Sequence, residues 1–173
     1  CQVGAELIGP SGPAADVEVV LMAAEALESI GVRNLSVDLG VPALAALVMQ
    51  DCTFTDTQAR DLRIAINRKD SAGVAAFSAV LGDQALAALL GMLDAVGPAA
   101  AALKKLNAID LGQDASAQRA HLSAVVQGVL SANDTVQITI DPVENRGFEY
   151  HSGNNEHFLN VQEIQEFDKL AAQ

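Results

Sequence analysis

Cysteine and aromatic residues are both scarce in this sequence, which narrows the kind of protein it can encode. Aromatic side chains make up 3% of the 173 residues, so alanine and the branched aliphatic residues must form the core. The two cysteines, Cys1 and Cys52, are too few for a disulfide framework and lie in no metal-binding spacing. We therefore expect a helix-rich α/β protein of a reducing compartment, the cytoplasm, with no metal site and no cofactor.

Basic residues and long apolar runs are scarce too. Ten Lys and Arg stand against 22 Asp and Glu, for a formal net charge of −12. We expect no nucleic-acid binding, because neutralised phosphates supply most of the affinity in such complexes. No apolar stretch is long enough to cross a bilayer and no signal-peptide pattern opens the chain, so we expect no membrane contact. The chain does not begin with Met, and we expect it to be part of a longer protein.

The hydrophobic pattern predicts strands towards both ends of the chain and helices between them. Alternating apolar residues indicate strands, whereas apolar residues three and four positions apart indicate helices. The expected strands are residues 2–8, 35–39, 136–140 and 148–151, and the expected helices are residues 14–30, 42–50 and 160–172, with residues 55–130 almost entirely helical. Thr55 with Gln58 predicts a capping box, and Asp70 and Asp83 are expected to cap the next two helices.

The first informative segment is Gln-Val-Gly-Ala-Glu at residues 2–6. Gln2 and Glu6 share one face of the expected strand, about 13 Å apart, and Gly4 leaves that face open between them. An amide and a carboxylate beside bare backbone suit a small ligand that carries an ammonium group. The alternative interpretation is an ordinary solvated strand face.

The second informative segment is residues 141–153, where polar groups are dense on a short β-like run next to a turn. Arg146 has the fork geometry that binds a carboxylate, and Tyr150 and His151 are suited to contact a ring or to donate hydrogen bonds. The alternative here is an edge strand whose charges face water. The pattern alone does not decide between the two.

Together the two segments resemble histidyl-tRNA synthetases and their regulatory paralogues. Gln-x-Gly-x-Glu is similar to the strand that closes motif 2 of these class II enzymes. Residues 146–153, Arg-Gly-Phe-Glu-Tyr-His-Ser-Gly, are similar to the histidine-specific motif, Arg-Gly-Leu-Asp-Tyr-Tyr-Thr-Gly in the synthetases. The order of strand, helix, strand with Asp-Leu-Gly, helical insertion and histidine motif also agrees. The resemblance covers residues 1–153, and the sequence after Gly153 departs from the family.

The resemblance implies a histidine site. By position, Gln2 and Glu6 match the residues that hold the α-amino group of histidine, and Arg146 matches the arginine near its carboxylate. Tyr150 and His151 match the tyrosine pair of the motif, whose second member lines the imidazole pocket. A histidine in that second position resembles the regulatory paralogues.

The resemblance also implies a fold: part of a class II aminoacyl-tRNA synthetase-like α/β core. This core has an antiparallel sheet with flanking helices and an all-helical insertion. Residues 1–53 and 135–173 would belong to the core and residues 54–134 to the insertion.

The function implied is that of a non-catalytic, histidine-binding regulatory subunit of ATP phosphoribosyltransferase, the first enzyme of histidine biosynthesis. Its partners would be L-histidine and the short-form catalytic subunit, in a hetero-oligomer. The chain contains neither motif 1, nor the motif 2 arginine, nor motif 3, so we do not expect it to adenylate histidine. The alternatives are a part of a true histidyl-tRNA synthetase, or a structural domain without a ligand.

Overall fold

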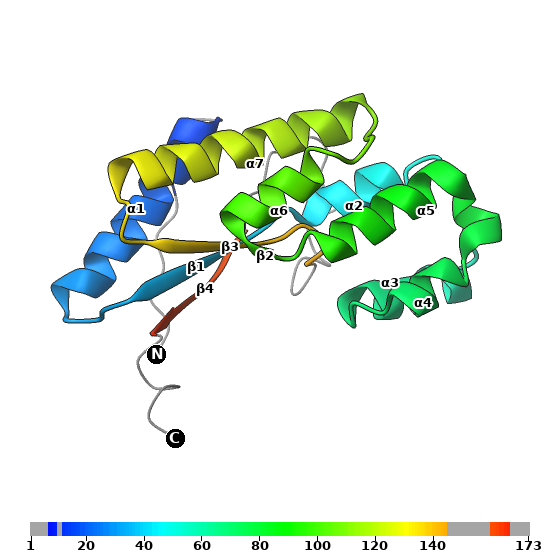
Figure 1. The fold of residues 1–173 in the computed structure, drawn as a ribbon, viewed down its shortest axis with the longest axis horizontal. Coiled ribbons are helices and arrows are strands. Elements are labelled where there is room, and N and C mark those ends of the chain that lie inside the picture. Colours follow the sequence, from blue (N-terminus) through cyan, green and yellow to red (C-terminus); the bar gives the residue numbers. More distant parts are fainter. Residues whose placement is uncertain (1–6, 10–11, 145–159, 167–173) are drawn as a thin grey trace, which may run out of the picture.

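The computed structural model contains a four-stranded sheet with helices packed on it (Figure 1). The structure describes residues 7–9, 12–144 and 160–166. The strands lie in the order β2-β3-β1-β4, and they are β1 (Leu35–Gly40), β2 (Gly97–Pro98), β3 (Gln137–Asp141) and β4 (Asn160–Glu166). The central pair, β1 and β3, is parallel, whereas β4 runs antiparallel to β1 and β2 antiparallel to β3.

The expected α/β class is confirmed, with two differences in detail. The sheet is mixed rather than wholly antiparallel, because the chain leaves β1, crosses over through helices and returns in the same direction as β3. Residues 54–134 are also not entirely helical, since they contain β2, which adds a short edge to the sheet. The division of the chain at residues 53/54 and 134/135 stays a prediction.

The helices lie close to where the hydrophobic pattern predicts them. They are α1 (Pro13–Ser29), α2 (Pro42–Val48), α3 (Asp56–Asn67), α4 (Ser71–Ala75), α5 (Ser78–Asp94), α6 (Ala99–Leu106) and α7 (Gln113–Ala132). None of the helices in the described ranges is long and apolar enough to cross a membrane.

Two of the three helix caps that the sequence predicts are confirmed. The Thr55 hydroxyl accepts a hydrogen bond from the Gln58 amide, and the Gln58 side chain accepts one from the Thr55 amide at 3.0 Å, which completes the predicted capping box. Asp70 caps α4 by accepting from the Gly73 amide at 2.9 Å. The expectation for Asp83 is wrong, because α5 already begins at Ser78 and Asp83 follows a kink inside it. Gly82 makes that kink at φ 72°, a value that favours glycine.

The core lies between the central strand and the long helices. Leu35, Val37 and Leu39 of β1 are at most 3% exposed. Helix α7 runs along the upper side of the sheet in Figure 1 and packs against α1 and α2. Gly128 allows this close approach, since a Cβ there would lie 2.6 Å from the Val17 side chain of α1. Helix α7 therefore belongs to the layer that covers the sheet.

The expectation of a helix at residues 160–172 is wrong, because Asn160–Glu166 form β4. The apolar residues Val161 and Ile164 are three positions apart, which is a helical spacing. In the sheet they pair with Leu39 and Val37, which are two positions apart, because the register shifts between these two pairs. A bulge of this kind places one extra residue in one strand, so a strand can carry a spacing of three.

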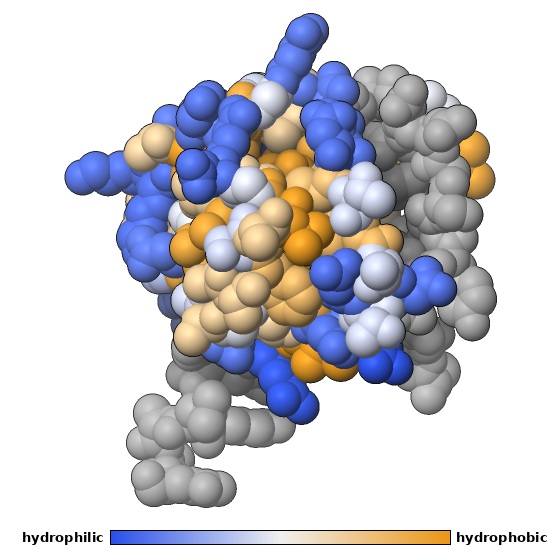
Figure 2. Space-filling model, turned by 90° about the vertical axis from the view of Figure 1, so that its right-hand side faces the viewer, coloured by the Kyte–Doolittle hydropathy of each residue, from blue (hydrophilic) through white to orange (hydrophobic). Residues whose placement is uncertain are grey.

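Helices α3, α4 and the start of α5 form the end of the molecule away from the sheet. Seen from that side, apolar side chains occupy the centre of the surface and hydrophilic ones surround them (Figure 2). The exposed residues of α4 and the first turn of α5 include Ala75 and Ala79. This end is built from short, alanine-rich helices, as the sequence indicates.

Candidate functional site

The five residues predicted to hold histidine lie outside the described part of the chain. Gln2 and Glu6 come before residue 7, and Arg146, Tyr150 and His151 come after residue 144. Their assembly into one site stays a prediction. The described residues that lead up to Arg146 nevertheless form a pocket with the sheet. We call it the strand-end pocket, and it is the candidate site.

The strand-end pocket lies where the parallel strands β1 and β3 end, and it encloses about 270 Å³. Pairing of Asp38 with Thr139 and of Gly40 with Asp141 brings together two segments that are far apart in the sequence. Ligands of open α/β sheets bind outside the carboxyl ends of the strands, which is where this pocket opens. Its lining residues are Asp38, Leu39, Gly40, Val96, Gly97, Thr139, Ile140, Asp141 and Glu144.

Acidic side chains give this pocket its chemistry. Asp38, Asp141 and Glu144 all line it, and an ionised carboxylate is a hydrogen-bond acceptor only. The described lining residues include no histidine, cysteine or lysine. The arrangement therefore favours binding of a ligand with donor groups, such as an ammonium, over nucleophilic chemistry.

A lysine from the helical part of the chain contacts the edge of this pocket. The Lys69 Nζ lies 2.8 Å from Oδ1 and 2.7 Å from Oδ2 of Asp141. The same Oδ1 accepts a hydrogen bond from the Val143 amide at 3.2 Å, so the chain is held as it leaves β3. Sequence analysis missed Lys69, because its partner is 72 residues away and no local pattern marks the pair. Asp38 carried a signal, since it stands in the Asp-Leu-Gly that ends a predicted strand.

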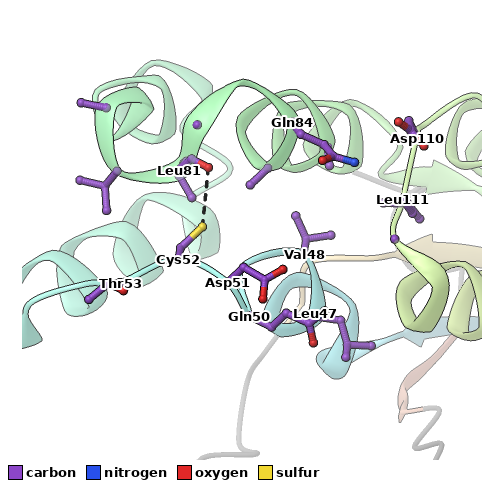
Figure 3. Close-up of a pocket in the computed structure, with 16 residues that line it drawn as sticks. Leu47, Val48, Gln50, Asp51, Cys52, Thr53, Leu81, Gln84, Asp110 and Leu111 are labelled. Carbon is purple, nitrogen blue, oxygen red and sulfur yellow. Dashed lines mark hydrogen bonds between the residues drawn. The ribbon is translucent and has the colours of Figure 1, made fainter.

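A second pocket lies between helices, and we call it the helical pocket (Figure 3). It encloses about 380 Å³ between the end of α2, α5 and the connection from α6 to α7. Several of its polar lining residues are labelled in Figure 3. Gln50 and Asp51 follow α2, Gln84 lies on α5, and Asp110 precedes α7. The Cys52 thiol, which also lines it, donates a long hydrogen bond to the Leu81 carbonyl oxygen at 3.6 Å. Among the described residues that line it there is no histidine, lysine or arginine.

Metal binding finds no support in the described ranges. No group of three or more His, Cys, Asp or Glu residues within residues 7–9, 12–144 and 160–166 is placed to hold a metal ion.

Curated relatives agree with the resemblance seen in the sequence. The chain is 43% identical over 152 residues to the ATP phosphoribosyltransferase regulatory subunit of Rhodospirillum centenum, which covers 88% of this chain and 38% of the relative. It is 44% identical over 152 residues to the protein of the same name from Paramagnetospirillum magneticum, with 88% and 39% covered. The chain thus spans less than two fifths of the length of these relatives.

Solved structures agree with the fold. An ATP phosphoribosyltransferase regulatory subunit/histidyl-tRNA synthetase from Bacillus halodurans superposes with a TM-score of 0.61 at 19% identity, over 79% of this chain and 36% of that chain. The ATP phosphoribosyl transferase (HisG:HisZ) complex from Thermotoga maritima gives a TM-score of 0.59 at 15% identity, over 78% of this chain and 47% of that chain. At these identities the likeness concerns the fold alone.

The family itself follows from a match to nearly the whole chain. Residues 1–155 match the model of the family described as histidyl-tRNA synthetase. This range includes both segments that carry the resemblance, the one with Gln2 and Glu6 and the one with Arg146, Tyr150 and His151. The chain therefore belongs to the histidyl-tRNA synthetase family.

Proposed function

We propose that this chain is the histidine-binding part of a regulatory subunit of ATP phosphoribosyltransferase, the first enzyme of histidine biosynthesis. One observation carries the proposal: the similar proteins from Rhodospirillum centenum and Paramagnetospirillum magneticum, at 43% and 44% identity, both bear that name. We call the longer protein to which this chain would belong the parent. The parent would act in the cytoplasm and would bind L-histidine without transforming it.

The proposed histidine site combines the two sequence motifs with the strand-end pocket. Glu6, assisted by Gln2, would accept from the α-ammonium group, and Arg146 would bind the carboxylate. Tyr150 and His151 would contact the imidazole ring. The position of Glu144 supports this assignment, because it lines the strand-end pocket and stands two residues before Arg146 in the sequence.

The proposed partner is the short-form catalytic subunit of ATP phosphoribosyltransferase, in a hetero-oligomer with the parent protein. A solved HisG:HisZ complex of ATP phosphoribosyl transferase from Thermotoga maritima shares the fold, which supports this partnership. Histidine would inhibit by binding more tightly to one state of the complex than to the other, as every allosteric effector must.

The test uses the full-length parent mixed with the catalytic subunit across a titration of L-histidine. We expect a complex on size-exclusion chromatography whose phosphoribosyl transfer is inhibited by histidine. A coupling of about 1–3 kcal/mol would change apparent affinities roughly 5–150-fold. Absence of a complex, or a complex whose activity ignores histidine, would contradict the proposal.

The second candidate function is that of a histidyl-tRNA synthetase, because the matching family model carries that description. One measurement distinguishes the two functions. A synthetase forms an adenylate and catalyses histidine-dependent exchange of pyrophosphate into ATP, whereas a regulatory subunit does not. Exchange by the full-length parent alone would establish the synthetase in place of the regulator.

A further inference from the structure

Helix α1 has an exposed acidic face with an apolar residue at its centre. Glu18, Met22 and Glu25 are spaced by four and three positions, so they lie on the same side of the helix. All three are exposed, and Met22 retains 44% of its surface. The helix contains four acidic residues and no lysine or arginine. We call Glu18, Met22 and Glu25 the acidic stripe.

Helix α3 has an exposed face of the opposite charge. Arg60, Ile64 and Arg68 follow one another at intervals of four positions, and the C-cap residue Arg68 keeps a right-handed helical backbone, so the three share one side. Each is exposed, and Ile64 retains 43% of its surface. Residues 60–69 hold four of the ten Lys and Arg residues in a chain with a net charge of −12. We call Arg60, Ile64 and Arg68 the basic stripe.

The two stripes match in length as well as in charge. A helix rises about 1.5 Å per residue, so the two charges of the acidic stripe are about 10.5 Å apart along the axis and those of the basic stripe about 12 Å. In both stripes the apolar residue lies about 6 Å from the first charged one. Packed together, the stripes would bring Met22 against Ile64 and would place each glutamate beside an arginine. Burial of the two apolar side chains would then add to ion pairs that contribute little by themselves at a surface.

The neighbouring Asp61 leaves the basic stripe available. The Arg60 Nε lies 3.3 Å from Oδ1 of Asp61, but the two side chains are 71% and 49% exposed. An ion pair this exposed is weak, because water and salt screen it. Arg60 can therefore exchange this neighbour for a carboxylate of another molecule.

The two stripes of one molecule do not meet, because α1 and α3 lie at opposite ends of the described structure (Figure 1). An acidic segment of an unrelated protein would cover only the basic stripe, whereas a second copy of this chain offers a complement to both. We propose that two copies associate by packing the acidic stripe of one on the basic stripe of the other. The contact joins two different surfaces, so it is of the head-to-tail kind. It involves neither histidine nor the catalytic subunit and goes beyond the proposed function.

The test is disulfide cross-linking between copies of the full-length parent. One copy carries Met22→Cys and the other Ile64→Cys, and mild oxidation of the mixture should join position 22 to position 64. Peptide mapping by mass spectrometry distinguishes this link from links to the native cysteines. Leu130→Cys, at a leucine of α7 that is 40% exposed, replaces Ile64→Cys in the matched control. The control should give little cross-link, because a disulfide needs Cα atoms within about 7 Å of each other.

Charge reversal tests the complementarity itself. Arg60→Glu with Arg68→Glu in the Ile64→Cys copy places like charges opposite each other, and we expect the link to form about tenfold more slowly. Glu18→Lys with Glu25→Lys in the Met22→Cys copy should then restore the rate, because the new lysines face the new glutamates. The restoration also shows that the first loss was not caused by misfolding.

Asp51→Lys with Asp110→Lys is the control for net charge. These two exposed residues lie outside both stripes, and their substitution in the Met22→Cys copy changes the net charge by the same amount. It should not restore the link. The absence of a link between positions 22 and 64, an equal link to position 130, or a link that charge reversal leaves unchanged would each overturn the inference. So would an equal restoration by Asp51→Lys with Asp110→Lys, because association would then depend on net charge and not on the stripes.

Discussion

The strand-end pocket and the helical pocket both present carboxylates, yet the molecule builds them in different ways. In the strand-end pocket, main-chain pairing of β1 with β3 sets the positions of Asp38 and Asp141, and Lys69 neutralises one of the acids. In the helical pocket, Asp51 and Asp110 stand in connections between helices, and the lining residues that the structure describes include no basic one. A site needs functional groups that a rigid frame holds in place. The strand-end pocket meets this condition as a candidate site, whereas the acidity that both pockets share does not distinguish them.

The largest expected effect concerns the frame of the strand-end pocket. Leu39 is fully buried on the central strand and lines the pocket. Leu39→Ala should lower the free energy of unfolding by about 2–5 kcal/mol, because it removes buried methyl groups and leaves a cavity. Urea denaturation measures this loss. Leu130→Ala, at a leucine of α7 that is 40% exposed, is the matched control and should cost much less. Similar losses in both variants would contradict the central role of β1.

The next effect tests whether Glu6 belongs to a histidine site. Glu6→Ala in the full-length parent should weaken the binding of L-histidine by about 1.5–3 kcal/mol, because a hydrogen bond between charged groups is lost. Titration calorimetry gives the affinity. Glu18→Ala makes the same charge change at an exposed position of α1 and should leave binding unchanged. An unchanged affinity in Glu6→Ala would remove Glu6 from the site.

A smaller effect on the free energy of unfolding is expected from the helical part, where a local helix cap, and not a contact between distant segments, is removed. Thr55→Ala removes the side-chain half of the capping box at the start of α3 and should reduce the free energy of unfolding by about 1 kcal/mol. Thr57→Ala, two residues further along the same helix, supplies no cap and should be close to neutral. Thermal or urea unfolding of the two variants decides the matter, and equal stability would mean that the cap contributes nothing measurable.

The smallest expected effect is on the helical pocket. Asp51→Ala changes one of its two carboxylates at an exposed position, so it should alter L-histidine affinity by less than the roughly 0.5 kcal/mol typical of surface changes. The measurement is the same calorimetric titration as for Glu6→Ala. A loss comparable to that of Glu6→Ala would reverse the comparison and place the histidine site among the helices.

Much of the fold was predictable, because it depends on local patterns. The alternation of Leu35, Val37 and Leu39 marked β1, and the capping box at Thr55 marked the start of α3. The failures have physical causes. The bulge in β4 gave Val161 and Ile164 a spacing of three, which is typical of a helix. Helix α5 begins at Ser78 and continues past the kink at Gly82, so Asp83 lies inside the helix and not at its start.

The motifs with Glu6 and Arg146 could be recognised in the sequence from the types and order of their residues, and the range matched by the family model includes them. Their roles in a histidine site stay a prediction. The charge balance of the strand-end pocket was not predictable. It depends on Lys69 and Asp141, and nothing in the residues around Lys69 indicates a partner 72 positions away.

The sequence by itself determined the class of the fold, the family and the motif residues, because hydrophobic spacing, helix caps and short motifs are properties of neighbouring residues. Only the tertiary structure decided that β1 and β3 lie side by side, that β4 pairs with β1, and that Lys69 faces Asp141. These contacts form between distant segments when the chain buries its apolar residues. Their geometry follows from the packing of the whole core, which no local pattern encodes.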